Sequence, residues 1–153
     1  MPVEWLSFDW SLISSHLVKV VGAFILALPI AWERERATRI MGLRTFPLVA
    51  VGSCGFVLVA VAVVGWDADA QARIIQGLIT GMGFIGGGAI LKEDDGVHGT
   101  ATAASIWSTG VVGAAVAYGR LEIAVVIVLI VLVVLRFFTP LKSRIGHRSD
   151  VDG

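Results

Sequence analysis

Five apolar segments dominate this chain, and each is close to the roughly 20 residues that a helix needs to cross the hydrocarbon core of a bilayer. They cover residues 17–32, 46–64, 74–91, 101–118 and 121–138. Lipid cannot satisfy backbone N–H and C=O groups, so segments of this kind must be helical. The sequence therefore predicts an all-α membrane protein, a compact bundle of five transmembrane helices. An N-terminal interfacial segment (residues 1–16) and a polar tail (residues 139–153) flank this bundle.

The composition agrees with that class and excludes several functions. Hydrophobic residues make up 56% of the 153 residues, which is typical of a small membrane bundle and not of a soluble domain. The net charge is zero, so the sequence gives no basis for nucleic-acid binding. There is no nucleophile–base constellation and no phosphate loop, and the three histidines stand apart. We expect no catalytic residue and no cofactor, and any bound cation stays of unknown identity.

The basic residues predict the orientation of the bundle. If the loop between the first two segments is cytoplasmic, nine basic residues lie inside and only three, Lys19, Arg73 and Arg120, lie outside. The positive-inside rule then places the N-terminus outside the cell and the C-terminus in the cytoplasm. The nine inside are Arg34, Arg36, Arg39, Arg44, Lys92, Arg136, Lys142, Arg144 and Arg148.

The loop after the first segment carries an unusual mixture of charges. Its residues of interest are Glu33, Arg34, Glu35, Arg36, Gly42, Arg44 and Thr45. Glu33 is three residues from Arg36, and Glu35 is four from Arg39, spacings that place opposite charges on one helical face. Two interpretations stay open. The segment is either an interfacial collar that anchors the helix, or an ion-pair network and docking surface that Arg44 and Thr45 complete against the acidic residues 93–95.

The third and fourth segments are rich in small and polar residues. On a helical projection Gly77, Gly81 and Gly88 share one face of the third segment, and Gln76, Gly83 and Gly87 share a second face. Small residues on two faces predict a central helix that neighbours approach closely on both sides. In the fourth segment Thr102, Ser105, Thr109 and Gly113 lie along one face, and Trp107 points nearly opposite.

Two interpretations of these segments stay open as well. In the first, each hydroxyl bonds a neighbouring helix or its own i−4 carbonyl, and the glycines serve packing alone. In the second, Gly86, Gly87 and Gly88 unwind the helix and direct free carbonyls at a cation, beside the hydroxyls of the fourth segment. Three glycines in a row cost roughly 1 kcal/mol each relative to alanine, so either tight packing or a purposeful break must compensate.

These motifs, in this order, resemble the MgtC/SapB family of bacterial inner-membrane proteins over about residues 30–120. They are Glu33-Arg34-Glu35, Gly42-Leu43-Arg44-Thr45, Ala72-Arg73-Ile74 with Gln76, Gly81-Met82-Gly83-Phe84-Ile85-Gly86-Gly87-Gly88-Ala89-Ile90, and Gly99 followed by Thr102-Ala103-Ala104-Ser105-Ile106-Trp107. The chain departs from the family pattern at Ala31-Trp32, where a glycine usually precedes the Glu-Arg pair, and at Ala101, where a hydroxyl is usual. The resemblance covers the membrane domain and not the soluble C-terminal domain of longer relatives.

The resemblance implies a multi-pass protein of the bacterial inner membrane that takes part in magnesium homeostasis and regulates other membrane proteins. We expect lipid and other membrane proteins as partners, with a homodimer through Gly77, Gly81 and Gly88 as a further arrangement. The alternative function is a small, dimeric cation transporter or channel with a polar path between the third and fourth helices. A third is a purely structural membrane subunit.

Overall fold

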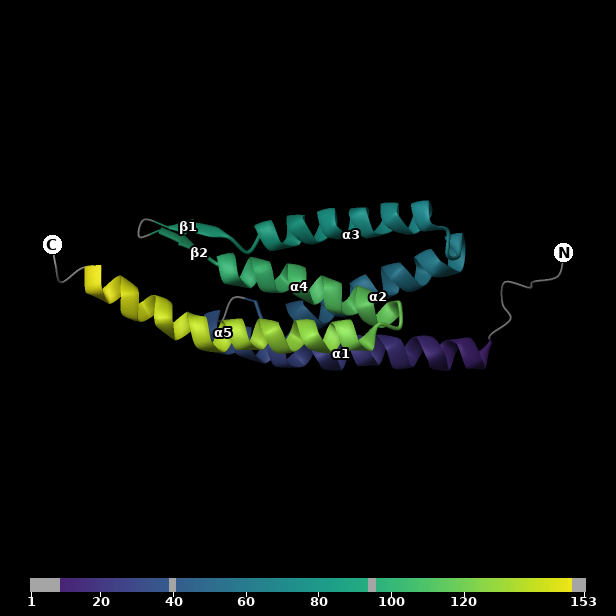
Figure 1. The fold of residues 1–153 in the computed structure, drawn as a ribbon, viewed down its shortest axis with the longest axis horizontal. Helices are drawn as coiled ribbons and strands as arrows, with labels where there is room; N and C mark the ends of the chain where they lie inside the picture. Colours follow the sequence, from purple (N-terminus) through teal and green to yellow (C-terminus); the bar gives the residue numbers. More distant parts are fainter. Residues whose placement is uncertain (1–8, 39–40, 94–95, 150–153) are drawn as a thin grey trace.

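Five helices and one short hairpin make up the fold of this computed structural model, which describes residues 9–38, 41–93 and 96–149 (Figure 1). The helices are α1 (Trp10–Thr38), α2 (Thr45–Val64), α3 (Ala68–Gly87), α4 (Thr100–Ala117) and α5 (Leu121–Ser149). Between α3 and α4, strands β1 (Leu91–Glu93) and β2 (Gly96–His98) pair antiparallel, with Leu91 opposite His98. The prediction of five helices is confirmed, but only four of them in the described part of the chain are long and apolar enough to cross a membrane. The hairpin was not predicted.

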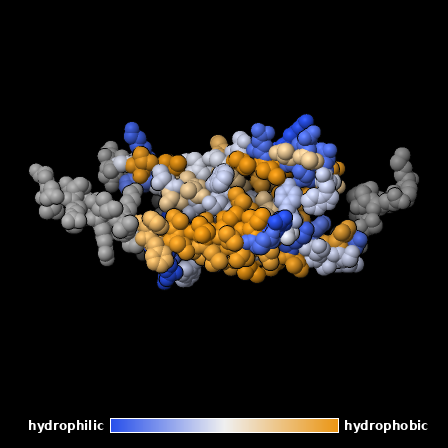
Figure 2. Space-filling view, viewed as in Figure 1, coloured by the Kyte–Doolittle hydropathy of each residue, from blue (hydrophilic) through white to orange (hydrophobic). Residues whose placement is uncertain are grey.

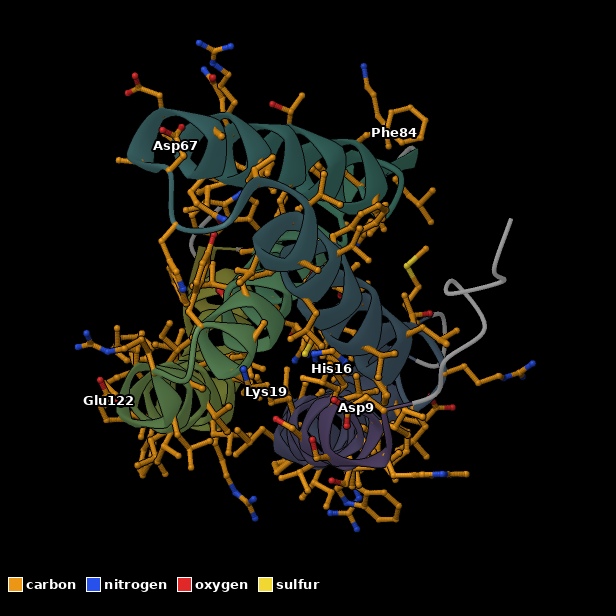
Figure 3. All side chains as sticks on the ribbon, turned by 90° about the vertical axis from the view of Figure 1, so that its right-hand side faces the viewer. Asp9, His16, Lys19, Asp67, Phe84 and Glu122 are labelled. Atoms are coloured by element: carbon orange, nitrogen blue, oxygen red, sulfur yellow. The ribbon has the colours of Figure 1, made fainter. Side chains whose placement is uncertain are left out.

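The helices lie roughly side by side along the long axis of the molecule. In Figure 1, α1 and α5 form one side, α4 and α2 lie in the middle, and α3 forms the opposite side. The view from one end shows the same order, with α3 set apart from the α1 side (Figure 3). Because consecutive helices run in opposite directions, the last turns of α1, the hairpin and the end of α5 meet at one end of the bundle.

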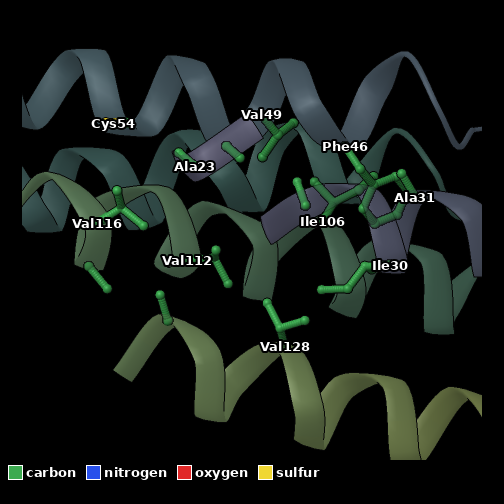
Figure 4. Packing of buried hydrophobic residues seen from close by; sticks show 14 of the residues in the cluster. Ala23, Ile30, Ala31, Phe46, Val49, Cys54, Ile106, Val112, Val116 and Val128 are labelled. Carbon is green, nitrogen blue, oxygen red and sulfur yellow. The ribbon is translucent and has the colours of Figure 1, made fainter. Parts of the chain in front are cut away.

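The central helix is α4, which contacts α1, α2, α3 and α5. Its buried side chains Ile106, Val112 and Val116 belong to a hydrophobic core that also contains Val49 of α2 and Val128 of α5 (Figure 4). The approach of α2 depends on Gly113, because a Cβ atom there would meet the backbone carbonyl oxygen of Ala50. Small-residue packing therefore operates in this bundle, and its centre is the fourth helix.

The prediction that the third helix is central is wrong. In the described part of the chain, α3 packs mainly on α4 and less on α2, at the edge of the bundle. Cβ atoms added at Gly77, Gly81, Gly83 or Gly87 would find nothing within 4 Å. Four helices are long and apolar enough to cross a membrane: Trp10–Ala37, Thr45–Val64, Thr100–Ala117 and Leu121–Phe138. Helix α3 is not among them, because its polar residues and glycines lower its hydropathy.

Three predicted boundaries differ from the structure for identifiable reasons. Helix α1 starts at Trp10 because the Asp9 carboxylate accepts a hydrogen bond from the Ser11 N–H, at 2.9 Å, so residues 10–16 continue the first helix and form no separate segment. Helix α3 starts at Ala68, capped by Asp67, and ends at Gly87, so residues 91–93 form a strand and not the end of a span. Helix α5 continues through Ser149, beyond the predicted end of the span at Phe138.

Candidate functional site

The outward side of α3 carries a continuous row of polar and small residues. Its members are Asp69, Arg73, Gln76, Thr80, Gly83 and Gly87, all of them exposed. At 100° per residue these six positions fall within about 80° of one another, so they form one face along the whole helix. We call this row the polar α3 face. Hydrophilic surface gathers over the first turns of α3 in Figure 2, whereas the side formed by α1 and α5 is a band of hydrophobic surface.

This face is also smooth. Added Cβ atoms at Gly83 and Gly87 would have no neighbour within 4 Å, and the same holds for Gly77 and Gly81 beside the face. Figure 3 shows Phe84 pointing away from the bundle on the same helix. In a bilayer, helix surfaces built from glycine and hydroxyl residues are those that other helices approach closely. The structure therefore groups Arg73, Gln76, Gly83 and Gly87 on an exposed side of the protein.

The inner side of α3 packs on α4 through apolar contacts. A cavity of about 270 Å³ lies between α3, α4 and the start of α5, and its lining includes Leu78, Met82 and Trp107. At one end of the interface, a Cβ added at Gly86 would lie 3.2 Å from the Ala103 carbonyl oxygen. The space between the third and fourth helices is thus largely apolar, as opposed to the polar path that the transporter hypothesis requires.

The hydroxyl groups of α4 serve mainly their own helix. The Ser105 hydroxyl donates to the Ala101 carbonyl oxygen at 2.7 Å, and the Thr109 hydroxyl donates to the Ser105 carbonyl oxygen at 2.8 Å. Both side chains are buried. The first interpretation, in which hydroxyls bond i−4 carbonyls, is confirmed for these two residues. Trp107 points to the α3 side, where it lines the apolar cavity.

The three consecutive glycines end α3, and the carbonyl groups of the first two remain hydrogen-bonded. The Gly86 carbonyl oxygen accepts from the Ala89 N–H at 3.0 Å, and the Gly87 carbonyl oxygen accepts from the Ile90 N–H at 3.1 Å. Gly88 forms the C-cap. The helix does break at this point, but the second interpretation is wrong for Gly86 and Gly87, whose carbonyls are engaged in tight turns. The described residues also contain no group of three His, Cys, Asp or Glu side chains that could hold a metal ion.

The charged segment at the end of α1 forms contacts other than those predicted. A Glu35 carboxylate oxygen accepts from the Leu43 N–H at 3.0 Å, which fixes the turn into α2, and Gly42 packs directly against Glu35. Glu33 lies 3.9 Å from an Arg136 guanidinium nitrogen on α5. The predicted Glu33–Arg36 pair is wrong, because the Arg36 guanidinium lies over the Trp32 ring, 5.3 Å from its centroid. The predicted Glu35–Arg39 pair involves a residue outside the described ranges.

Arg34 differs from its neighbours because it points into the bundle. It is 3% exposed, and it lines a cavity of about 390 Å³ together with Thr102 of α4 and residues of α5. Arg44 and Thr45 line a different cavity, between α2 and α3, together with Met82. The predicted contact of Arg44 and Thr45 with the acidic residues 93–95 falls outside the described side chains.

Sequence reasoning missed a polar network at the other end of the bundle. The Lys19 ammonium group donates to the Ala117 carbonyl oxygen at 2.9 Å and so satisfies the last turn of α4 (Figure 3). The Gln71 amide donates to the Gly65 carbonyl oxygen at 2.6 Å, and the Tyr118 hydroxyl donates to the Gln71 amide oxygen at 2.5 Å. The available signal was a lone lysine within an apolar segment and the single tyrosine of the chain.

Comparisons with known proteins point to one family. A model described as the MgtC family matches residues 20–144 of this chain. Protein MgtC of Brucella abortus is 34% identical over 140 residues, which cover 92% of this chain and 58% of that protein. Protein MgtC of Salmonella typhimurium is 32% identical over 117 residues, covering 76% of this chain and 49% of that protein. Protein SrpB of Synechococcus elongatus is 32% identical over 151 residues, covering 91% of this chain and 79% of that protein.

The chain thus spans about half the length of the MgtC proteins that it matches. No solved structure matches the fold.

Proposed function

The chain belongs to the MgtC family, and from that premise we propose that it is a multi-pass inner-membrane protein that regulates other membrane proteins and takes part in magnesium homeostasis. Membership of the family supports a multi-pass membrane protein located in the bacterial inner membrane. The observation that carries the regulatory part is the polar α3 face, because this face is unsuited to lipid and its residues are exposed on the outer side of the bundle. In the membrane, a helix of another membrane protein covers the polar α3 face.

The chemistry of the face argues against lipid as its permanent cover. An arginine or aspartate at the bilayer centre costs roughly 2.5–3.5 kcal/mol, and this cost falls toward the interfaces. Asp69 and Arg73 lie in the first two turns of α3, where an interface is near. Gln76, Thr80, Gly83 and Gly87 continue the face toward the other end of α3, where lipid offers no hydrogen bond to an amide.

A protein helix is well suited to this surface. Association of helices in a membrane relies on close backbone approach and on interhelical hydrogen bonds, not on a hydrophobic driving force. Gly83 and Gly87 provide the close approach, and Gln76 provides a side-chain amide that a partner can bond. A second copy of this chain is one such partner, and a copy with Cys54→Ser and Gly83→Cys would then form a disulfide-linked dimer.

The transporter alternative has less support from the geometry. The Ser105 and Thr109 hydroxyls are engaged in their own helix, and the cavity between α3 and α4 is lined mainly by apolar residues. A hydrated cation leaving water for such a space would lose ligands without replacement. If the chain were a purely structural subunit, a partner would also cover the polar α3 face. Substitutions on that face would then have no effect on growth at low magnesium.

The test is a bacterial strain whose growth at low magnesium depends on this chain. We expect Gly83→Leu to abolish that growth, because a large side chain there holds the partner helix away, while the variant folds and inserts normally. The matched control is Gly55→Leu on α2, where an added Cβ also has no neighbour within 4 Å. The control should grow like the unchanged protein.

Two results would contradict the proposal. Growth of the Gly83→Leu strain equal to that of the control would remove the polar α3 face as the regulatory surface. Rapid magnesium flux through the purified chain in proteoliposomes would instead favour a transporter.

A further inference from the structure

A groove between α1 and α5 lies at the end of the bundle where α1 ends, away from the polar α3 face. Its volume is about 450 Å³, within the range of cavities that hold small ligands. Leu28, Pro29 and Leu132 form its apolar part, and Glu33 and Arg136 form its charged part. Because the groove and the polar α3 face are separate surfaces, a ligand in the groove is independent of any helix that packs on α3.

The charged part of the groove lies at the depth of lipid headgroups. The stretch of α1 that could cross a membrane ends at Ala37, and that of α5 ends at Phe138. Glu33 and Arg136 are close to these ends, where hydrocarbon gives way to headgroups. Trp32 also lines the groove and is exposed, and tryptophan favours this interfacial depth. The apolar part belongs to the side of the molecule that Figure 2 shows as a hydrophobic band, where acyl chains pack.

The two charged groups of the groove are close together but do not saturate each other. A Glu33 carboxylate oxygen lies 3.9 Å from an Arg136 guanidinium nitrogen. An N–H···O hydrogen bond spans about 2.7–3.2 Å, so this contact is ionic without being a hydrogen bond. The Glu33 side chain is 22% exposed and the Arg136 side chain 73% exposed. A carboxylate accepts at both oxygens and a guanidinium has several N–H donors, so each group can bind a further partner from the membrane side.

This pair of opposite charges matches a zwitterion better than an ion of either sign. An anionic headgroup would be attracted by Arg136 and repelled by Glu33, and a lone cation would meet the reverse. A headgroup that carries a phosphate and a primary ammonium on a short ethylene bridge satisfies both residues. Its phosphate oxygens accept from the guanidinium, and its ammonium donates to the carboxylate. The quaternary ammonium of choline has no N–H, so it cannot make the second contact.

We propose that this groove binds phosphatidylethanolamine. The Arg136 guanidinium holds the phosphate, the Glu33 carboxylate holds the ammonium, and one acyl chain lies against Leu28 and Leu132. Hydrogen bonds to charged groups are the strong ones, and the interfacial position keeps them out of bulk water, where their electrostatic part would be weaker. The bound lipid would link the end of α1 to α5.

The experiment measures lipid binding by the full chain, purified in a non-ionic detergent. Phosphatidylethanolamine, phosphatidylcholine and phosphatidylglycerol with identical acyl chains are titrated in mixed micelles, and native mass spectrometry counts the bound lipid. We expect phosphatidylethanolamine to bind about tenfold more tightly than phosphatidylcholine, because only the former donates a hydrogen bond to the Glu33 carboxylate. Glu33→Gln should abolish this preference. Arg136→Gln should weaken the binding of phosphatidylethanolamine and phosphatidylglycerol about tenfold, because the phosphate loses its charged donor.

The matched controls are on the same helix as Arg136. Arg120→Gln and Glu122→Gln each remove one member of an exposed ion pair at the other end of α5. Both variants should bind like the unchanged chain. If Glu33→Gln fails to fold, the comparison of Arg136→Gln with Arg120→Gln carries the test, since both arginines are exposed.

Four results would overturn the proposal. The first is equal binding of phosphatidylethanolamine and phosphatidylcholine by the unchanged chain, and the second is tighter binding of phosphatidylglycerol than of either. The third is an undiminished preference for phosphatidylethanolamine in Glu33→Gln. The fourth is equal binding of phosphatidylethanolamine by Arg136→Gln and Arg120→Gln.

Discussion

Tyr118 shows how one side chain can connect three segments of this bundle. Its hydroxyl donates to Gln71, whose amide in turn donates to the last carbonyl of the α2 cap, and its ring lies 6.2 Å from the Trp66 ring between centroids. Burial raises the pKa of the Tyr118 hydroxyl above the 10.0 of a solvated phenol, because removal from water disfavours the phenolate. The neutral form is therefore the one that the folded protein prefers.

We predict that Tyr118 ionises only above pH 10.0 in the folded protein. Because the folded pKa is raised, its contribution to stability is fully present below the unfolded pKa of about 10 and is lost as the pH rises through the folded value. The chain has one tyrosine, so phenolate absorbance during an alkaline titration reports this residue alone. Tyr118→Phe provides the baseline. A midpoint at or below pH 10.0 would show that the side chain is solvated.

For Arg34, the sequence predicted the position on the helix but not the burial of the side chain. Its position in the charged segment was readable, and its spacing from Glu33 and Arg36 is fixed by the helix. Its burial could not be predicted, because a helical projection gives the face of the helix on which a side chain lies. The projection does not show which other helix packs against that face. The same limit explains why Thr102, Ser105 and Thr109 were grouped correctly on one face but not distinguished by their hydrogen bonds.

The α2–α4 interface is the tightest helix contact that a glycine controls here. A Cβ at Gly113 would meet the Ala50 carbonyl oxygen and lie 3.0 Å from the Ser53 Cβ atom. Backbone cannot move aside as a flexible side chain can, so the two helices would have to separate along part of their core.

We predict that Gly113→Ala lowers the free energy of unfolding by about 1–3 kcal/mol, the usual cost of overpacking a core. The measurement is reversible denaturation in detergent micelles. Gly77→Ala is the matched control, since a Cβ there has no neighbour within 4 Å and alanine favours the helix. Equal stability of the two variants would mean that α2 and α4 are not in close contact at Gly113.

The helices themselves followed closely from hydropathy. The predicted spans 46–64, 101–118 and 121–138 differ from α2, α4 and the apolar part of α5 by at most one residue at each end. The position of α3 at the edge of the bundle could not be predicted from hydropathy. A glycine pattern shows that another helix can approach closely, but it does not show that one does. The hairpin between α3 and α4 was also missed, since its three-residue strands are too short for an alternating pattern to be distinctive.

The direction of the whole bundle across the membrane stays a prediction from its charges. We expect the hairpin end, with Arg34, Arg36 and Arg44, to face the cytoplasm, because basic residues are retained on that side. In a Cys54→Ser background, a cysteine replacing Ala37 should react with a membrane-impermeant thiol reagent only after the cells are opened. A cysteine replacing the exposed Trp66 should react in intact cells. The reverse pattern would invert the topology.

If another membrane protein covers the polar α3 face, as proposed, the described part of the chain also limits how many such partners can bind. The opposite side, formed by α1 and α5, is a hydrophobic band that lipid covers well (Figure 2). A protein with one such surface can bind one partner helix at a time. Such a protein would occupy the edge of a larger complex and could not link two partners to each other. Titration with a partner protein should therefore saturate at one copy of this chain per binding helix of the partner.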